Sequence, residues 1–237
     1  MLNHLPTLTA RPTVRHLDLV FALDTICSVE MFEVRRQFIR NVLDIVQHGL
    51  QSQGQINTSV FAYGPHVDDW RSPSPQDGLR GFKGTPLWPD PGLALQHLEE
   101  QECQLGYTFE AAYEEVLQAL YTLNWKRSSH RVLITVGHRP PHPFRRWLVE
   151  TGDPLDCFNQ PFCENNLDWR FLLTCMRSFL RMHSITVVCP PFWPPHSRLS
   201  YTEKYANACW KEIGYTSALR LESTSAERVA DMVLQLV

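Results

Sequence analysis

One stretch near the amino terminus constrains the fold most: residues 17–23 are almost continuously apolar, and an acidic residue and a short polar turn follow them. A strand that is apolar on both faces belongs in the centre of a parallel sheet with helices on both sides. Ligands of such sheets bind just beyond the carboxyl ends of the strands, where Asp24 and Ser28 fall. The sequence therefore places a candidate site at the end of its first strand.

Strand-like and helix-like segments alternate along the rest of the chain. Apolar residues recur at helical spacing from residue 30 to 50, and the pattern places Arg35, Arg36 and Arg40 on the solvent side. Because the helical crossovers are long enough for parallel pairing, we predict an α/β fold with a doubly wound, mostly parallel, Rossmann-like sheet and helices on both faces. The expected strands are 17–23, 56–63, 131–136, 184–189 and 218–221, with a short one near 79–82; the expected helices are 30–50, 91–104, 110–123, 169–181, 201–213 and 226–237.

We expect an extension over residues 1–15 and one domain over residues 16–237, with long loops at 64–92 and 139–168. Loops of this length in a compact domain usually have a function. Exposed aromatic anchors on stiff loops suit a protein interface, although they can equally fold back as small loop cores. The candidates are Trp70, Trp88, Trp193 and the prolines of segment 190–195.

Composition narrows the classes of partner. The net charge of −3 does not favour nucleic acid. No apolar run approaches the roughly 20 residues that span a bilayer, and we expect neither a membrane partner nor a secretory leader. Seven cysteines, most of them in apolar segments, favour free thiols in a cytoplasmic protein over a disulfide framework.

Several motifs together resemble those of von Willebrand factor A (vWA) domains. Residues 24–28 resemble the DxSxS or DxTxS turn that follows the first strand of the family, and Thr108 stands where the family carries a second-loop threonine. Segment 123–142 is similar to the "LPW…VLLVGDAPPH" pattern of a mainly bacterial branch, and Cys157 with Cys163 resembles a cysteine-containing insert of that branch. The resemblance runs from about residue 16 to the end of the chain.

The resemblance implies a metal-ion-dependent adhesion site, but a degenerate one. Mg²⁺ requires about six oxygen ligands, and here Ile26 replaces a hydroxyl ligand. The third-loop aspartate of the family falls at Val136 or Gly137, so a second carboxylate is missing. We therefore expect no cofactor; if Mg²⁺ binds, the resemblance assigns it to Asp24, Ser28 and Thr108. The predicted binding edge comprises Asp24, Ile26, Ser28, Thr108, Gly137 and His138.

Two of these residues have structural interpretations as well. Asp24 either is a surviving ligand, or caps the following helix or forms hydrogen bonds across the strand ends. Thr108 either is a ligand or is the N-cap of its own helix.

The remaining candidates have weaker motifs. His138 and His142 flank two prolines, which predicts surface loop histidines, although either could join Cys157 and Cys163 in a zinc site. Cys27 lies in the motif turn but has no evident catalytic partner, so we expect it to pack in the interior.

The resemblance implies a non-catalytic protein-interaction module, with a protein partner such as an AAA+ ATPase, a protease or another effector of a bacterial conflict or stress system. On this interpretation Asp24→Ala should leave the fold and binding largely intact. One alternative is a metal-dependent adhesion domain in which His138 supplies a ligand. Another is a hydrolase with Cys27 or Ser28 as nucleophile, although the chain contains neither a G-x-S-x-G elbow nor a phosphate loop.

Overall fold

The structure, a computed structural model, describes residues 15–50, 54–64, 82–104, 111–142, 167–189, 199–214 and 218–237. Within these ranges one six-stranded sheet has the strand order β3-β2-β1-β4-β5-β6. Every neighbouring pair is parallel except β2 and β3, which are antiparallel at one edge. The strands are β1 (Arg15–Asp24), β2 (Gly54–Tyr63), β3 (Phe82–Gly84), β4 (His130–Gly137), β5 (Met182–Val188) and β6 (Ala218–Arg220).

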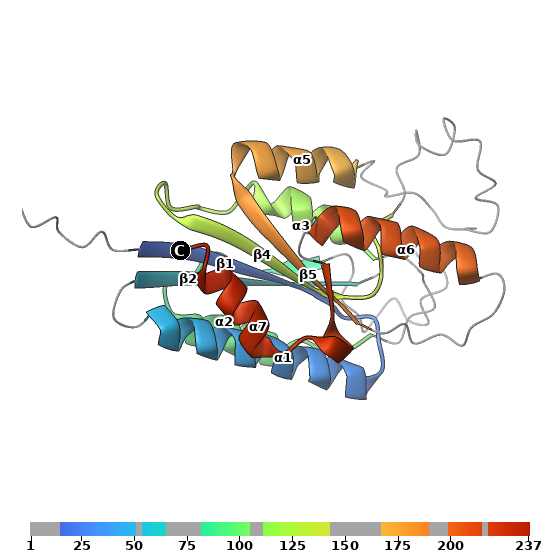
Figure 1. The fold of residues 1–237 in the computed structure, drawn as a ribbon, viewed down its shortest axis with the longest axis horizontal. Helices are drawn as coiled ribbons and strands as arrows, with labels where there is room; N and C mark the ends of the chain where they lie inside the picture. Colours follow the sequence, from blue (N-terminus) through green and yellow to red (C-terminus); the bar gives the residue numbers. More distant parts are fainter. Residues whose placement is uncertain are drawn as a thin grey trace, which may run out of the picture.

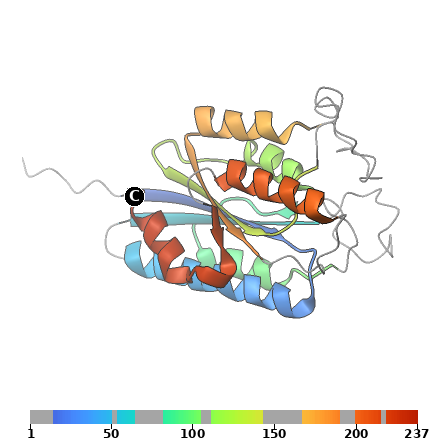
Figure 2. The ribbon, with the colours of Figure 1, turned by 45° about the vertical axis from the view of Figure 1, so that its right-hand side comes forward.

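Helices cover both faces of this sheet, which confirms the predicted doubly wound α/β fold (Figure 1). One face is covered by α1 (Val29–Leu50), α2 (Pro91–Glu99) and α7 (Ala226–Leu234). The other face is covered by α3 (Tyr113–Leu120), α5 (Trp169–Phe179) and α6 (Leu199–Gly214). Figure 2 shows the same two layers from a second direction.

Strand β1 lies at the centre because it is apolar on both faces, as the sequence predicts. Leu19 and Phe21 pack into the cluster under α1, α2 and α7, whereas Val20 and Ala22 pack into the cluster under α3, α5 and α6. All four side chains are fully buried. Alternation along a strand sends successive side chains to opposite faces, so one strand joins the two cores.

Several expected elements differ in their boundaries: the helix expected over 110–123 is α3 at Tyr113–Leu120, and α5 and α7 end at Phe179 and Leu234. The short strand near residues 79–82 is β3, at Phe82–Gly84. The helix expected over 91–104 ends as α2 at Glu99, because the chain beyond it pairs with the turn after β1: the Gln104 N–H donates to the Thr25 carbonyl at 2.8 Å. This pairing holds the segment after α2 against the carboxyl end of β1.

The domain boundaries lie partly outside the described residues. Residues 1–14 of the expected extension are outside them, and β1 begins at Arg15. The loop expected at 64–92 contains β3, and of the loop at 139–168 only the two ends are described. None of the helices in the described ranges is long and apolar enough to span a bilayer.

Candidate functional site

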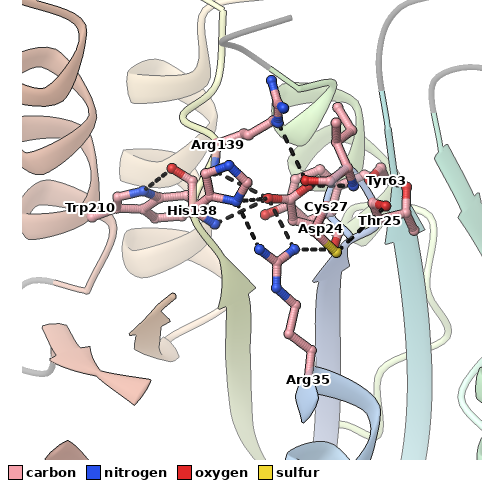
Figure 3. Close-up of polar contacts among 9 residues, drawn as sticks. Asp24, Thr25, Cys27, Arg35, Tyr63, His138, Arg139 and Trp210 are labelled. Atoms are coloured by element: carbon pink, nitrogen blue, oxygen red, sulfur yellow. Dashed lines mark hydrogen bonds and ion pairs between the residues drawn. The ribbon is translucent and has the colours of Figure 1, made fainter. Parts of the chain in front are cut away.

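Asp24 ends β1 and lies fully buried at the carboxyl edge of the sheet (Figure 3). Its Oδ1 accepts the Ile26 N–H at 2.9 Å. Its Oδ2 accepts the N–H groups of His138 at 3.1 Å and of Arg139 at 3.2 Å. The carboxylate therefore holds the turn after β4 against the end of β1. Of the roles expected for Asp24, this is the one that forms hydrogen bonds across the strand ends.

Arg35 brings a guanidinium from α1 to the same carboxylate. Its Nη1 donates to the Asp24 carbonyl at 2.6 Å and lies 3.3 Å from Oδ2. Both side chains have an exposed fraction of 0%. The expectation that Arg35 faces solvent is wrong. It lies three residues after Phe32 and four before Ile39, both buried, so helical periodicity could have placed it inside.

The surroundings keep Asp24 ionised. Burial alone would raise the pKa of this carboxyl, but the Arg35 guanidinium and a hydrogen bond with His138 lower it, and the net pKa lies well below the usual range. A guanidinium is always protonated in proteins. Asp24 and Arg35 therefore form a buried ion pair at the edge where the sequence predicts a site.

His138 completes this network from the turn after β4. Its Nδ1 lies 2.7 Å from Arg35 Nη2 and 3.2 Å from Asp24 Oδ2. Because a guanidinium can only donate, Nδ1 is the acceptor, and the neutral ring carries its proton on Nε2. Burial, together with Arg35 and Arg139, lowers the pKa of His138, although Asp24 acts in the opposite direction.

His138 has an exposed fraction of 8%, so the prediction of a surface loop histidine is wrong. The turn that carries it is fixed from a second side, because Trp210 Nε1 donates to the His138 carbonyl at 3.0 Å. Its Nε2 is buried and has no hydrogen-bond partner within the described ranges.

Gly137 allows β4 to approach this network closely. A Cβ at this position would lie 2.5 Å from the Asp24 Cβ and 2.9 Å from the Tyr63 hydroxyl oxygen. The third-loop aspartate that the resemblance to vWA domains would place at residue 137 therefore has no room there unless Asp24 and Tyr63 move. The ends of β1, β2 and β4 pack so closely at this point that no carboxylate side chain fits at residue 137.

The other predicted residues of the turn have structural contacts. Ser28 Oγ accepts the Met31 N–H at 3.3 Å, which is the geometry of an N-cap for α1. Ile26 is fully buried in the cluster beneath α3, α5 and α6. Cys27 has an exposed fraction of 6%, and burial raises the pKa of its thiol to about 12. Cys27 therefore packs in the interior and stays protonated.

A second buried pair, which was not predicted from the sequence, joins the segment after β4 to α3. His142 Nδ1 lies 3.0 Å from Glu114 Oε1, and the His142 N–H donates to Oε2 at 3.2 Å. Their exposed fractions are 2% and 0%, so the expectation of a surface histidine is wrong for His142 too. Glu114 precedes Leu117 by three residues on the apolar side of α3, a spacing that could have indicated its burial.

Several predicted residues lie outside the described ranges, so their interpretation stays a prediction: Thr108, Cys157, Cys163, Trp70, Trp193 and segment 190–195. Trp88 is described and does not project as an anchor. Its backbone pairs with Thr58, and its side chain packs against the core cluster and lies edge-on to the His97 ring at 6.4 Å. Among the described residues, no group of three or more His, Cys, Asp and Glu side chains could hold a metal ion.

Comparison with known proteins supports the fold. No model of a protein family matches the chain, and no curated protein matches it. The chain is similar to the pilus adhesin SpaC from Lactobacillus rhamnosus GG in its open conformation, with 11% sequence identity and a TM-score of 0.57. A second structure of the same adhesin matches with 12% identity and a TM-score of 0.57. Each match covers 94% of this chain but 30% of the adhesin, and shows a shared Rossmann-like α/β fold.

Proposed function

We propose that this chain is a non-catalytic protein-interaction module of the vWA-like type, with a degenerate ion site at the carboxyl edge of its sheet. The observation that carries the proposal is the buried Asp24–Arg35 pair. In this proposal Arg35 supplies permanently, from within the chain, the positive charge that a divalent cation would supply in an intact site. Partner binding should then not require a metal.

The contacts of Asp24 support this interpretation. Both of its oxygens already accept N–H groups, and Arg35 adds a full positive charge beside Oδ2. A hard cation would have to displace these donors and gather several further oxygens. Nearby, Ile26 and Gly137 offer no side-chain oxygen, and Ser28 is engaged as a helix cap.

The partner that we propose is a protein of the same bacterial multi-component system, such as an AAA+ ATPase, a protease or another effector. This step rests on the resemblance to the bacterial vWA branch and on analogy of fold. The structural neighbour is named as an adhesin, which agrees with binding as the function. We also propose a cytoplasmic location, because most of the seven cysteines lie in apolar segments, which favours reduced thiols.

Calorimetry with the full chain tests whether the site binds a divalent metal ion. We expect no heat of binding from Mg²⁺ or Mn²⁺, and a partner captured by the chain should remain bound when EDTA is added. The matched variant is Ile26→Ser, which restores the hydroxyl position of the family motif but leaves Arg35 in place; it too should bind no Mg²⁺. Heat from Mg²⁺ in the wild type, or loss of the partner in EDTA, would contradict the proposal.

One observation favours a second candidate, a metal-dependent module that uses His138. The Nε2 atom of this residue is buried and has no hydrogen-bond partner within the described ranges. It can bind a metal only if the ring proton moves to Nδ1, which would then donate to Asp24 Oδ2, 3.2 Å away, instead of accepting from Arg35. Imidazole prefers Zn²⁺ to Mg²⁺, so a Zn²⁺ titration distinguishes the two candidates. Zn²⁺ binding that is lost in His138→Gln but kept in His48→Gln, at an exposed histidine of α1, would support this second candidate.

A further inference from the structure

The outer face of α5 exposes large apolar side chains in an ordered row. Phe171 and Phe179 have exposed fractions of 65% and 77%. They lie eight residues apart, or roughly 12 Å along the helix, and Cys175 lies between them on the same side. We call Phe171, Cys175, Phe179 and the adjacent Tyr121 the α5 stripe.

Tyr121 extends the stripe towards α3. It is 39% exposed, and its hydroxyl donates to the Leu172 carbonyl at 3.2 Å. Single exposed apolar residues are ordinary on a protein surface, whereas a contiguous row marks an interaction site. The buried side of α5 is separate and faces the core with Trp169, Leu173 and Met176, so the stripe has no role in that packing. Figures 1 and 2 show α5 on the opposite side of the sheet from α1 and α7.

Cations predominate in the two segments that carry the stripe, although Asp168 caps the start of α5 and Glu212 pairs with Arg170. Segments 121–131 and 169–183 contain no Asp or Glu, although the protein as a whole carries a net charge of −3. By contrast α1, on the other face, contains both acidic and basic residues. The cations of the two segments are Lys126, Arg127, Arg131, Arg170, Arg177 and Arg181.

Most of these cations are held in place by the chain itself. Arg170 Nε donates to Glu212 Oε2 at 2.7 Å, and Arg131 Nη1 donates to the Leu180 carbonyl at 2.8 Å. Arg127 and Arg181 are exposed. They precede β4 and β5, which are neighbours in the sheet, so both lie at the end of α5 that carries Phe179.

We propose that the α5 stripe is a docking surface for an acidic amphipathic segment of a partner protein. Apolar side chains of that segment would cover Phe171 and Phe179, and its carboxylates would pair with Arg127 and Arg181. The argument is complementarity: apolar anchors beside positive charge with no carboxylate in the two segments select a partner that is both apolar and negative.

The restraint on the cations favours a protein segment over an anionic membrane. Membrane recognition by charge uses clusters of about four to eight mobile Lys or Arg side chains, and here Arg170, Arg177 and Arg131 are committed to internal hydrogen bonds. The exposed guanidinium groups that remain, Arg127 and Arg181, are fewer than such a membrane cluster, but each can pair with a carboxylate of a protein segment. This surface lies on the helical layer and does not depend on the Asp24 network, so either proposal can fail without the other.

The test is selection of peptides from a display library of random 16-residue sequences on the full chain. We expect selected peptides to be enriched in Asp and Glu between apolar residues. Their affinity should fall roughly tenfold in the double variant Phe171→Ser/Phe179→Ser and about threefold in Arg127→Gln/Arg181→Gln. The matched control is Val34→Ser/Leu93→Ser, which removes comparably exposed apolar residues from α1 and α2 and should not change the affinity.

Three results would overturn the proposal. Selected peptides without acidic enrichment would contradict the charge argument, and equal binding to the phenylalanine variant would contradict the location. Sedimentation with phosphatidylcholine vesicles that contain one third phosphatidylserine, if lost in the same variant, would assign the stripe to a membrane. Thermal unfolding of each variant at the wild-type temperature excludes a general loss of structure.

Discussion

Two aspartates of β1 are fully buried six residues apart, and their carboxyl groups have different kinds of partner. Asp18, near the amino end, accepts neutral donors: the Asn57 amide at 2.6 Å, the Lys126 N–H at 3.0 Å and the Ser129 hydroxyl. Asp24, at the carboxyl end, accepts backbone N–H groups and also faces the buried cation of Arg35. The same residue type on the same strand therefore accepts hydrogen bonds from neutral donors at one end and forms an ion pair at the other.

The difference sets two kinds of stabilisation of a buried carboxylate side by side on one strand. Neutral hydrogen bonds satisfy a buried carboxylate, and those of Asp18 hold the connection between α3 and β4. A buried ion pair is costly to desolvate, and removing one partner leaves an uncompensated buried charge. The Asp24 end is also the edge where sheets of this kind bind their ligands.

The largest expected effect distinguishes the two aspartates directly. Asp24→Ala leaves the Arg35 guanidinium buried without its carboxylate, and should lower the free energy of unfolding by about 3–5 kcal/mol. Asp18→Ala leaves only neutral donors unsatisfied, and should cost about 1–3 kcal/mol. Urea unfolding followed by circular dichroism measures both. This result would replace the sequence-based expectation that Asp24→Ala is harmless, and equal losses at the two sites would break the comparison.

Gly137 offers a steric test of the crowded end. A Cβ there meets the Asp24 Cβ at 2.5 Å, so Gly137→Ala should destabilise the protein by roughly 1–3 kcal/mol through overpacking. The control is Gly92→Ala in the first turn of α2, where the Cβ meets only the Asp90 side-chain oxygen at 3.1 Å. Comparable midpoints of urea unfolding for the two variants would show that the strand ends can move apart to accommodate a Cβ at residue 137.

The pH dependence of stability should also differ between the two ends. Because the pKa of His138 is lowered in the folded state, the unfolded chain binds a proton that the folded chain does not as the pH falls below about 6.5. Stability should therefore decrease with falling pH there, by up to about 1.4 kcal/mol per pH unit. The lowered pKa of Asp24 adds a further loss only below about pH 3.9.

The variant His138→Gln removes the upper of these two pH windows. We expect it to reduce the slope of unfolding free energy against pH between pH 6.5 and 5, measured by urea titrations at each pH. His48→Gln, at an exposed histidine, should leave the slope unchanged. If the slope of unfolding free energy against pH is the same in His138→Gln as in the wild type, a group other than His138 takes up the proton on unfolding.

The smallest expected effect concerns Ser28, beside Asp24. If this residue acts only as a helix cap, Ser28→Ala should cost about 1 kcal/mol, the same as Ser225→Ala at the N-cap of α7. Thermal unfolding with and without Mg²⁺ measures both. A Mg²⁺-dependent difference that appears only at Ser28 would assign it a ligand role.

Local patterns predicted most of the fold. The apolar run of β1, the helical periodicity of α1 and the alternation of elements each depend on neighbours in the sequence, so they can be read without tertiary contacts. Position 24 at a strand end also follows from the sequence alone. The antiparallel edge strand β3 was displaced by a few residues, because its pairing with β2 depends on a partner distant in the chain.

The partners of the candidate site could not be predicted. A charged residue in a helix is normally assigned to solvent, so Arg35 and Glu114 were interpreted by residue type although their spacing placed them with buried neighbours. His138 and His142 were assigned to a surface loop because the prolines between them indicate a loop. Whether a loop is buried depends on which distant residues pack against it, and the local sequence does not show this.

The sequence by itself determined the layered α/β architecture and the position of an acidic residue at its carboxyl edge, because periodicity and strand ends are local properties. Only the tertiary structure decided what neutralises that residue. Arg35, Asp24 and His138 come from three separate elements, and their 2.6–3.3 Å contacts exist only once α1 and β4 pack against β1.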